Sequence, residues 1–433
     1  MKWLVYNALF ALVFPFLLPG FLLRMLRRGG YRARMGDRFA LYPSDIRRAL
    51  LEGGRVWIHA VSVGEVQVAG QLMREWRRVE PSVRFCFSTT SSTGWKMAER
   101  EVAPGDVLIY NPLDFPNFVK SALLTVRPRA LVLTESEIWP VFIRAAKKRG
   151  IPIFLINARV SDRSAPRYRL ARAWFGDVFS SLTRIFAQSE LDSRRLVAAG
   201  APADRIEVTG SFKFDVAKRN PSKEEELRKW IAPAEGTRIL LGGSTWPGED
   251  EVLLRLYSDL LHDSDVPPTV LVIAPRHFEK ADAIEEHIVK AGFVCVRRSR
   301  GESGGAAAVS TGVRVYLADT TGELMGLYGI ASVVFVGKSL CAHGSQNMIE
   351  PCLCGKPTLV GPYTENFRPV MSDLLDGAAI LQVSDEAQLG REIHRLLSDD
   401  AAARQLGERA AAAVRRRSGV VPRCVAEIRE AIQ

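Results

Sequence analysis

Apolar and polar positions along this chain form one repeated pattern. From Arg55 onward, short runs rich in β-branched residues alternate with longer stretches in which apolar residues recur at helical spacing. This alternation is typical of βαβ units, in which helices connect the strands of a parallel sheet. The strands predicted in the first half are RVWIHAV, VRFCFST, DVLIY, ALVLTES, IPIFLINA, RIFAQ and RIEVTG.

The pattern breaks between residues 218 and 236 and then restarts. This segment, KRNPSKEEELRKWIAPAEG, is polar and contains two prolines that interrupt regular structure. The strands predicted after it are RILLGGS, TVLVIAP, FVCVRR, RVYLAD, VVFVGK, PTLVGP and AILQV. A chain of 433 residues suits two α/β domains. We therefore predict a first domain over residues 39–217, a linker over 218–236, and a second domain over 237–433 that includes terminal helices.

The amino terminus differs from the rest of the chain. Residues 3–23 contain Asn7 as their one strongly polar side chain, and they are about long enough to cross a bilayer as a helix. A basic collar follows, formed by Arg24, Arg27, Arg28, Arg32, Arg34 and Arg38. Such a collar holds its end of an apolar helix on the cytoplasmic side. Residues 1–38 are therefore predicted to anchor the chain at a membrane, with a buried amphipathic helix or a cleaved signal as alternatives.

Charge and composition narrow the classes of partner. Lys and Arg outnumber Asp and Glu by 59 to 48, which gives a net charge of +11 and suits an anionic partner. Charge alone does not choose among phospholipid, phosphorylated glycolipid and nucleic acid, but no aromatic RNA-binding motif is present. The histidines and cysteines show no metal-binding spacing, so we predict no metal site.

Two parallel sheets bind ligands beyond the carboxyl ends of their strands, so motifs at these ends are the candidates for chemistry. In the first half, HAVSVGE places Glu65 in the first turn of a predicted helix, where a carboxylate can act as a general base. An acid in a first helical turn is also ordinary compensation of the helix dipole. TESEIWP adds Glu135 and Glu137, which share one side if the strand stays extended. TGSFKFD places Lys213 between two aromatic residues before the linker.

Motifs of the second half suit phosphate and ribose. Leu241 to Trp246 is interpreted as a strand followed by a Gly-Gly-Ser-Thr turn, whose amides and hydroxyls could bind phosphate. Arg276, after the next strand, offers a bidentate guanidinium. Gly322-Glu323-Leu324 is predicted to open a helix after the strand that ends at Asp319, where its amides could contact a ribose or phosphate. Asn347 and Glu350 share one helical face, where a carboxylate can hold ribose hydroxyls. Each motif alone is equally compatible with a helix cap or turn.

The order of these motifs resembles one family. HAVSVGE, TESEIWP, NARVS, TGSFKFD, APRH, DTTGEL and NMIEP, after an apolar and basic amino terminus, closely resemble the 3-deoxy-D-manno-octulosonic acid (Kdo) transferases of lipopolysaccharide assembly. The resemblance extends from Trp3 to about residue 420. It implies a GT-B-type glycosyltransferase, in which two Rossmann-like domains face a central cleft behind a membrane-anchoring helix.

The resemblance also implies an activity and a location. A protein of this kind transfers Kdo from CMP-Kdo to lipid IVA, the lipid A precursor, with inversion at the anomeric carbon. The first domain binds the acceptor and the second binds the donor. No metal or other cofactor is expected, and neither is a nucleic acid partner. The enzyme is expected at the cytoplasmic face of the cell inner membrane, in contact with anionic lipids.

Site residues follow from the same resemblance, motif by motif. The catalytic base falls on Glu65, and its transition-state partners fall on Glu135 and Lys213. The nucleotide contacts fall on Pro275, Arg276, Gly322, Glu323, Leu324, Asn347, Met348, Ile349 and Glu350. The chain departs from the family's glycine-rich lead into the last of these motifs, where it has a lysine near the start and Ser345-Gln346 in place of Gly-His.

Other functions share parts of this pattern. A glycoside hydrolase could use Glu65 and Glu135 as its carboxylate pair, but it would not explain the nucleotide motifs of the second half. A nucleotide-sugar epimerase could have the same fold, although it has no need of an anchor. A non-enzymatic binder of anionic membranes or nucleic acid would use the basic excess without needing acids at strand ends.

Overall fold

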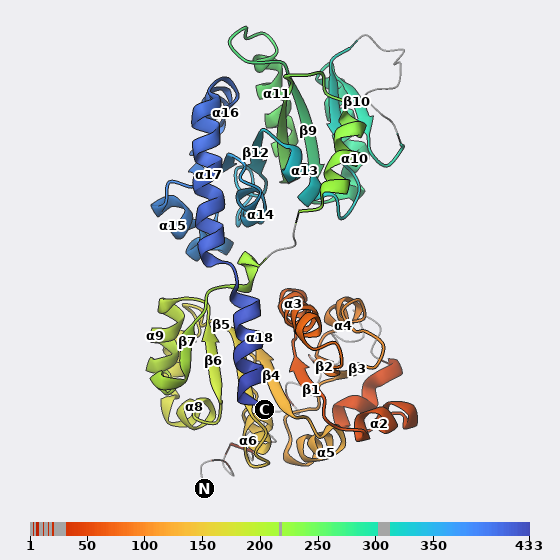
Figure 1. Cartoon of the computed structure of the whole chain (residues 1–433), viewed down its shortest axis with the longest axis vertical. Helices are drawn as coiled ribbons and strands as arrows, with labels where there is room; N and C mark the ends of the chain where they lie inside the picture. Colours follow the sequence, from red (N-terminus) through yellow and green to blue (C-terminus); the bar gives the residue numbers. More distant parts are fainter. Residues whose placement is uncertain are drawn as a thin grey trace. The chain divides into compact units, whose positions relative to one another are not determined.

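The computed structural model divides this chain into two compact α/β units. It describes Trp3, Tyr6, Asn7, Leu12, Phe16, Gly20 and residues 32–215, 219–301 and 312–433. The first unit comprises Met1–Asp215 together with Gly419–Gln433, and the second comprises Val216–Ser418 (Figure 1). Each unit has a parallel sheet covered by helices on both faces, as the alternating pattern predicts.

The sheet of the first unit has the order β3-β2-β1-β4-β5-β6-β7. All of its neighbouring strands pair in parallel. The chain adds strands on one side of β1 and then continues on the other side with β4. The strands are β1 (Val56–His59), β2 (Phe85–Thr89), β3 (Val107–Tyr110), β4 (Ala130–Thr134), β5 (Ile153–Ala158), β6 (Arg184–Ala187) and β7 (Ile206–Val208).

The sheet of the second unit repeats this plan with the order β10-β11-β9-β8-β12-β13-β14. Its pairs are parallel as well. The direction of the chain reverses between β8 and β12. The strands are β8 (Arg238–Thr245), β9 (Thr269–Pro275), β10 (Val294–Arg297), β11 (Arg314–Leu317), β12 (Val333–Val336), β13 (Thr358–Val360) and β14 (Leu381–Gln382).

Burial on both faces explains why the strands are almost continuously apolar. In β1, Trp57 packs into one core, whereas Val56 and Ile58 pack into the core on the opposite face. Successive side chains of a strand point to opposite faces, so a sheet covered on both sides needs apolar residues at both parities.

Helices of the first unit form two layers. The core that contains Trp57 is closed by helices including α5, α6 and α8, and the core that contains Ile58 by α3 and α18. The helices are α2 (Ser44–Leu51), α3 (Val63–Val79), α4 (Ser92–Ala98), α5 (Pro116–Val126), α6 (Pro140–Lys147), α7 (Ala165–Leu170), α8 (Arg172–Phe179), α9 (Glu190–Ala198) and α18 (Val420–Ala431), with 3-10 turns at Arg32–Phe39, Ala203–Arg205 and Phe212–Phe214.

Helices α11, α12, α16 and α17 close one core of the second unit. Helix α10 contacts α13, and α14 contacts α17. The helices are α10 (Pro221–Ile231), α11 (Glu249–Leu260), α12 (Ala281–Lys290), α13 (Leu324–Ile330), α14 (Ile349–Leu353), α15 (Arg368–Asp376), α16 (Glu386–Ser398) and α17 (Asp400–Arg417), with 3-10 turns at Phe278–Lys280 and Glu365–Phe367.

The unit boundaries differ from the predicted domain boundaries in two places. The segment predicted as a linker contains α10, which packs on α13 and belongs to the second unit. The prediction that the second domain extends to residue 433 is wrong, because α18 belongs to the first unit. The terminal helices predicted there are α17, which ends at Arg417, and α18, whose N-cap is Gly419 with a left-handed φ of 85°.

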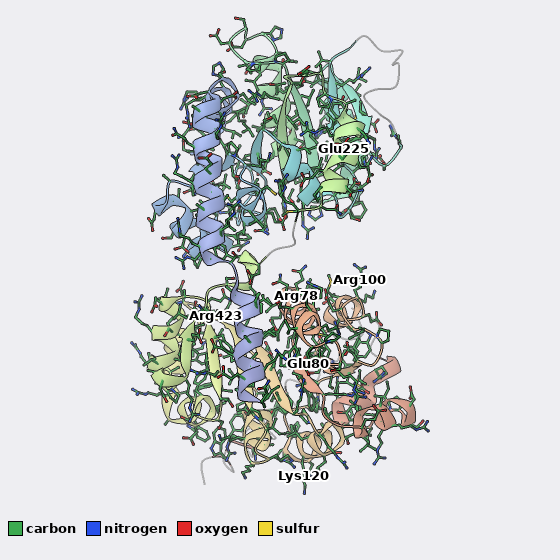
Figure 2. All side chains as sticks on the ribbon, in the orientation of Figure 1. Arg78, Glu80, Arg100, Lys120, Glu225 and Arg423 are labelled. Atoms are coloured by element: carbon green, nitrogen blue, oxygen red, sulfur yellow. The ribbon has the colours of Figure 1, made fainter. Side chains whose placement is uncertain are left out.

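Helix α18 completes the core of the first unit. Cys424, Val425 and Ile428 are buried against the sheet face that α3 also covers. The Asp215 carboxylate accepts hydrogen bonds from the amides of Gly419 and Val421, at 2.5 and 2.6 Å, and so holds the start of the helix. Ion pairs flank the packed face. Figure 2 labels Arg423, which pairs with Glu207 at 3.0 Å, and Glu80, which pairs with Arg429 at 3.1 Å.

The predicted anchor lies mainly outside the described residues. Among the residues that are described, no helix has both the length and the apolar character that a membrane crossing requires. Trp3 and Tyr6 pack against the first unit beside Trp174, whereas the side chains of Leu12 and Phe16 are exposed.

Part of the predicted basic collar is wrong, because Arg38 is buried in the first unit and Arg34 is partly buried there. The Arg38 side chain is only 2% exposed, donates to the carbonyl of Thr90 at 2.6 Å and stacks on the Tyr110 ring. Arg34 pairs with the buried Asp37 at 2.9 Å. A buried guanidinium is tolerated where such partners replace part of its hydration.

We predict that Ile428→Ala lowers the free energy of unfolding of the first unit by about 2–4 kcal/mol, because it leaves a cavity under the sheet. Urea denaturation followed by circular dichroism measures this change. Glu430→Ala, on the exposed side of the same helix, is the matched control and should change stability by less than about 0.5 kcal/mol. Equal effects of both substitutions would contradict the assignment of α18 to this core.

Candidate active site

The candidate residues of the first unit gather where its strand order reverses. Glu65 follows β1, and Glu135 and Glu137 follow β4, which is the neighbour of β1. The chain runs from β1 to β3 on one side and from β4 to β7 on the other, so the connections after β1 and β4 diverge. Ligands of doubly wound sheets bind at this place, beyond the carboxyl ends of the two strands.

Glu65 is held by hydrogen bonds from three directions. Its carboxylate accepts from the amide of Val61 at 2.8 Å, from the hydroxyl of Ser62 at 2.9 Å and from the hydroxyl of Thr134 at 3.3 Å. The Ser62 oxygen in turn accepts from the amide of Glu65 and caps α3. The side chain therefore has one orientation, and Glu65 also performs the capping function that its place in the first turn suggested.

Glu135 is held by the neighbouring strand β5. Its backbone is left-handed, with φ of 50°, so the strand does not stay extended through Glu137 as the shared-side prediction required. Asn157, at the end of β5, donates to its carboxylate at 3.3 Å, and Arg159 lies 3.6 Å away. Burial raises the pKa of Glu135, the Arg159 guanidinium opposes that rise, and the Glu65 carboxylate adds to it.

Glu137 is a third acid in the same cluster. The indole of Trp139 donates to its carboxylate at 2.9 Å, and His59 Nε2 lies 3.9 Å from the same oxygen. Burial and the negative charge of Glu65 raise the pKa of Glu137 to about 7. His59 is fully buried, and this burial lowers its pKa to about 3, so it is neutral and does not compensate the acids.

Lys213 supplies a positive charge to this group of acids. It lies in the 3-10 turn Phe212–Phe214, and the amide of Phe212 donates to Asn157 Oδ1 at 3.1 Å. Desolvation lowers the pKa of Lys213, whereas the Glu135 carboxylate opposes that change. Asn157 thus links the turn that carries Lys213 to Glu135.

The structure therefore brings together the three residues predicted as catalytic. Glu65 and Glu135 interact electrostatically, and so do Glu135 and Lys213. The predicted set does not include Asn157, although its motif is a polar cluster after a strand. Its left-handed φ of 51° marks it as a constrained position, which no sequence pattern revealed.

The predicted nucleotide contacts of the second unit follow three strands of one sheet. Pro275 and Arg276 lie at the end of β9, Gly322 to Leu324 follow β11, and Asn347 to Glu350 follow β12. In the sheet, β11, β9, β8 and β12 are successive neighbours. All of these residues therefore lie at the carboxyl edge of the central strands.

Arg276 is the exposed cation of this edge. Its amide donates to the carbonyl of Thr245 at 3.1 Å, which fixes the backbone after β9. Its side chain is exposed, and the described residues provide no hydrogen bond or ion pair to it. A guanidinium in this position is available for a bidentate contact with an anion.

The prediction of a Gly-Gly-Ser-Thr turn after β8 is wrong, because these residues are part of the strand. β8 continues to Thr245. A side chain at Gly242 would meet the Leu253 side chain at 2.4 Å, and one at Gly243 would meet the Tyr328 hydroxyl at 2.7 Å. The glycines therefore allow α11 and α13 to pack closely on the strand, and they do not form a phosphate-binding turn.

The segment after β11 begins α13 with a charged residue that is already paired. Glu323 interacts with Arg298 at 3.0 Å and with Lys223 at 2.7 Å. Burial acts to raise its pKa, but the hydrogen bonds from Arg298, Lys223 and Thr320 lower it to about 2. The Glu323 carboxylate is therefore occupied within the unit. Gly322, with a left-handed φ of 82°, and the amide of Leu324 remain at the edge.

The segment after β12 presents Asn347 and Glu350. The Asn347 amide donates to the Glu350 carboxylate at 3.0 Å, so the two side chains meet as their spacing predicts. Burial raises the pKa of Glu350, and the hydrogen bond from Asn347 opposes that rise. The side chains of Met348 and Ile349 are fully buried. Only their backbones can reach a ligand.

A buried acid that sequence reasoning missed organises the loop after β12. Glu249, with no exposed surface, accepts hydrogen bonds from the amides of Trp246, Lys338, Ser339, Leu340 and Cys341 at 2.8 to 3.4 Å. Glu249 is the first residue of α11, after the N-cap Gly248, so no capping-box pattern in the sequence marked it. Because this carboxylate occupies the loop amides, they are not available to a phosphate.

The described residues contain no group of three or more His, Cys, Asp or Glu side chains placed to hold a metal ion. The acids of the first unit are instead held by amides, hydroxyls and the Trp139 indole. Such an arrangement can orient one carboxylate for proton abstraction while neighbouring groups adjust its charge environment.

Comparison with known proteins found related sequences over most of the chain. A family model described as 3-deoxy-D-manno-octulosonic-acid transferase (kdotransferase) matches residues 33–216. A 3-deoxy-D-manno-octulosonic acid transferase of Haemophilus influenzae is 30% identical over 410 residues, which cover 93% of this chain and 92% of the relative. The transferase of Bordetella pertussis is 32% identical over 367 residues and covers 82% of each chain.

Solved structures share the fold at low sequence identity. A glycosyltransferase of Rickettsia africae aligns with a TM-score of 0.57 at 13% identity, over 88% of this chain and 98% of its own. A putative UDP-N-acetylglucosamine 2-epimerase of Listeria monocytogenes aligns with a TM-score of 0.56 at 14% identity, over 88% and 97%. These likenesses show a fold of two parallel α/β domains that transferases and epimerases share. The sequence relatives decide between them: the chain belongs to the 3-deoxy-D-manno-octulosonic acid transferase family and is a Kdo glycosyltransferase.

Proposed function

We propose that this chain transfers Kdo from CMP-Kdo to lipid IVA with inversion at the anomeric carbon. The chain belongs to this family, and one observation carries the proposal. The Glu65 carboxylate is held in one orientation at the switch point of the first sheet, which is the place between β1 and β4 where the strand order reverses. In this scheme the first unit binds the lipid acceptor and the second unit binds CMP-Kdo.

Glu65 is the proposed general base. Transfer to an alcohol requires removal of the hydroxyl proton as the oxygen attacks the anomeric carbon. The three hydrogen bonds to Glu65 fix its carboxylate, so no orientational freedom is lost when the acceptor binds. A single displacement by the activated hydroxyl inverts the anomeric configuration. Determining the anomeric configuration of the product by NMR tests this part of the proposal.

Glu135 and Lys213 are proposed to support the transition state. As the bond to cytidylate breaks, the sugar gains oxocarbenium character, and a nearby carboxylate stabilises this positive charge. Lys213 offers a cation for an acidic group of a substrate. Their mutual interaction, with Asn157 bridging Glu135 and the turn of Lys213, keeps both groups in place before substrate binds.

The second unit is proposed to hold the nucleotide. Arg276 is free to bind the phosphate, and fixed cations of this kind stabilise the charge that develops on the leaving group. The amides of residues 322–324 and the Asn347–Glu350 pair are proposed to contact the cytidine. This scheme requires no metal ion, because side chains provide the positive charge. Full activity in the presence of EDTA is its expected consequence.

A basic and apolar surface supports location at the cytoplasmic face of the inner membrane. Helix α7 has no buried residue and carries exposed Arg167, Arg169 and Leu170, the last with 92% of its surface exposed. α7 contacts α8, whose Trp174 packs against Trp3 in the apolar amino-terminal segment. Arginines beside exposed apolar side chains suit an anionic lipid surface, which attracts each cation with about 1 kcal/mol.

We predict that Glu65→Gln lowers kcat by about 10²- to 10⁴-fold, since the amide cannot accept the proton. Glutamine can still accept the Val61 hydrogen bond, so the melting temperature should change little. Kdo transfer to lipid IVA, followed by mass spectrometry, measures the rate. Glu190→Gln, in the first turn of α9, is the matched control and should keep full activity. Full turnover by the Glu65 variant would exclude Glu65 as the base.

The raised pKa of Glu137 predicts a pH-dependent stability. The folded state holds this proton up to about pH 7, whereas the unfolded carboxyl loses it near its ordinary pKa of 4.5. Stability from the neutral acid is therefore present below pH 4.5 and is lost as pH rises through 7. Glu137→Gln, which mimics the neutral form, should match the wild type at pH 4 and exceed it by roughly 1–3 kcal/mol at pH 8.

Urea denaturation of both proteins at the two pH values measures this difference. Comparing variant with wild type removes the contributions of other titrating groups, which both proteins share. Glu190→Gln is again the control, and its difference from the wild type should be the same at both pH values. A pH-independent difference for the Glu137 variant would show that this carboxyl does not titrate near neutrality.

The proposed membrane surface predicts a binding defect. Arg167→Glu combined with Leu170→Glu should reduce cosedimentation with vesicles of phosphatidylglycerol and phosphatidylethanolamine, because charge and apolar contact are both lost. Wild-type binding through α7 should also weaken as salt is raised. Val289→Glu, an exposed apolar position in the second unit, is the control. Unchanged binding by the double variant would exclude α7 as a membrane contact.

A further inference from the structure

Two residues without an assigned role lie at the switch point of the second sheet. Trp246 follows β8, and Lys338 lies just after β12, which pairs with β8. The strand order reverses between these two strands, as it does between β1 and β4 in the first unit. Ligands of this fold class bind beyond such a pair of strand ends.

Glu249 fixes the two residues relative to each other. One carboxylate oxygen, Oε2, accepts hydrogen bonds from the amide of Trp246 and from the amide of Lys338, each at 2.8 Å. The backbones also approach closely, since a side chain at Gly337 would meet the carbonyl oxygen of Ser244 at 2.4 Å. The positions of the indole and the lysine are therefore coupled through a buried group.

Lys338 lies at a backbone position that disfavours any residue with a side chain. Lys338 has a left-handed backbone with φ of 57°, a conformation in which a residue with a side chain is strained. Its ammonium lies 4.5 Å from the centre of the Trp246 ring, and the ring also contacts His277 edge-on at 5.2 Å. The strained backbone thus directs the cation over an aromatic face.

The cation is not neutralised by the residues around it. Within the described part of the chain, no carboxylate forms an ion pair with the Lys338 ammonium. The Glu249 carboxylate, which accepts from the Lys338 backbone amide, is already satisfied by the amides of the loop. Because Glu249 occupies the amides of residues 338–341, an anion beside this loop would be bound by side chains rather than by the loop backbone. Arg276, after β9 on the other side of β8, is an exposed cation at the same edge, whereas Lys338 is half-buried.

We propose that Lys338 is a donor-binding residue whose ammonium, held over Trp246, binds an oxyanion of the sugar nucleotide. This inference rests on the proposed function, because CMP-Kdo supplies the anion. The donor has two such groups, the phosphate of the nucleotide and the carboxylate of the sugar. Both have the chemistry that a lysine ammonium recognises.

Three substitutions test whether Lys338 binds the donor or only packs on the Trp246 ring. Lys338→Met keeps the stem and removes the charge, Lys338→Arg keeps a cation, and Lys338→Gly removes the side chain from a backbone conformation that glycine adopts freely. Lys290→Met, at the end of α12, is the control for loss of one positive charge from the same unit. Thermal unfolding, CMP titration calorimetry and steady-state kinetics with CMP-Kdo are measured on the full chain.

The expected result is a rise in KM for CMP-Kdo of roughly 10- to 100-fold in Lys338→Met and Lys338→Gly, the size of one lost charge-assisted hydrogen bond. Lys338→Arg should restore most of the affinity. Lys338→Gly should melt at the wild-type temperature or above it, since its backbone strain is relieved. The Lys290 variant should bind and turn over as the wild type does.

The CMP titration identifies the anion. An equal loss of affinity for CMP assigns Lys338 to the phosphate, whereas unchanged CMP binding with a raised KM for CMP-Kdo assigns it to the sugar carboxylate. Unchanged CMP binding together with an unchanged KM would overturn the proposal, and so would a lower melting temperature as the sole effect. If the wild type transfers no Kdo, the proposed function fails, and the CMP titration still tests Lys338.

Discussion

In each sheet, a carboxylate in the first turn of a helix accepts hydrogen bonds from both sides of the switch point and so connects the ends of its two strands. In the first unit, Glu65 of α3 folds back onto the amide of Val61 and the hydroxyl of Thr134, which ends β4. In the second, Glu249 of α11 folds back onto the amide of Trp246 and the loop after β12. Both carboxylates join the two strands between which the connections diverge. The chemistry proposed for each unit depends on this join.

The two carboxylates differ in whether a substrate can reach them. Glu249 has no exposed surface and accepts five amides, so it is a structural anion that shapes a loop. Glu65 is 8% exposed and accepts one amide and two hydroxyls, which hold it while leaving it within reach of a substrate. Around it, burial raises the pKa values of Glu135 and Glu137. A concentration of acids that costs folding free energy is expected where function requires it.

Burial also determines whether an arginine side chain stabilises the core or stays available to a ligand. Arg38 belongs by sequence to a collar behind an apolar segment, yet its guanidinium is enclosed by Thr90 and Tyr110 in the first unit. Arg276 is surrounded by fewer partners and remains exposed at the edge of the second sheet. The same side-chain chemistry thus stabilises a core in one place and remains available to an anion in the other. The difference is whether the fold supplies carbonyl and aromatic partners.

The sequence by itself determined the strands, the two-unit plan and the strand-end positions of Glu65, Glu135 and Arg276, because two-sided burial leaves continuous apolar runs and parallel sheets place their chemistry at one edge. It did not determine that α18 packs on the first unit, that Gly242 and Gly243 allow helices to pack closely on β8, or that Glu249 accepts the hydrogen bonds of the loop amides. These depend on contacts between segments far apart in the chain. Only the tertiary structure brings such partners together, so local pattern does not encode them.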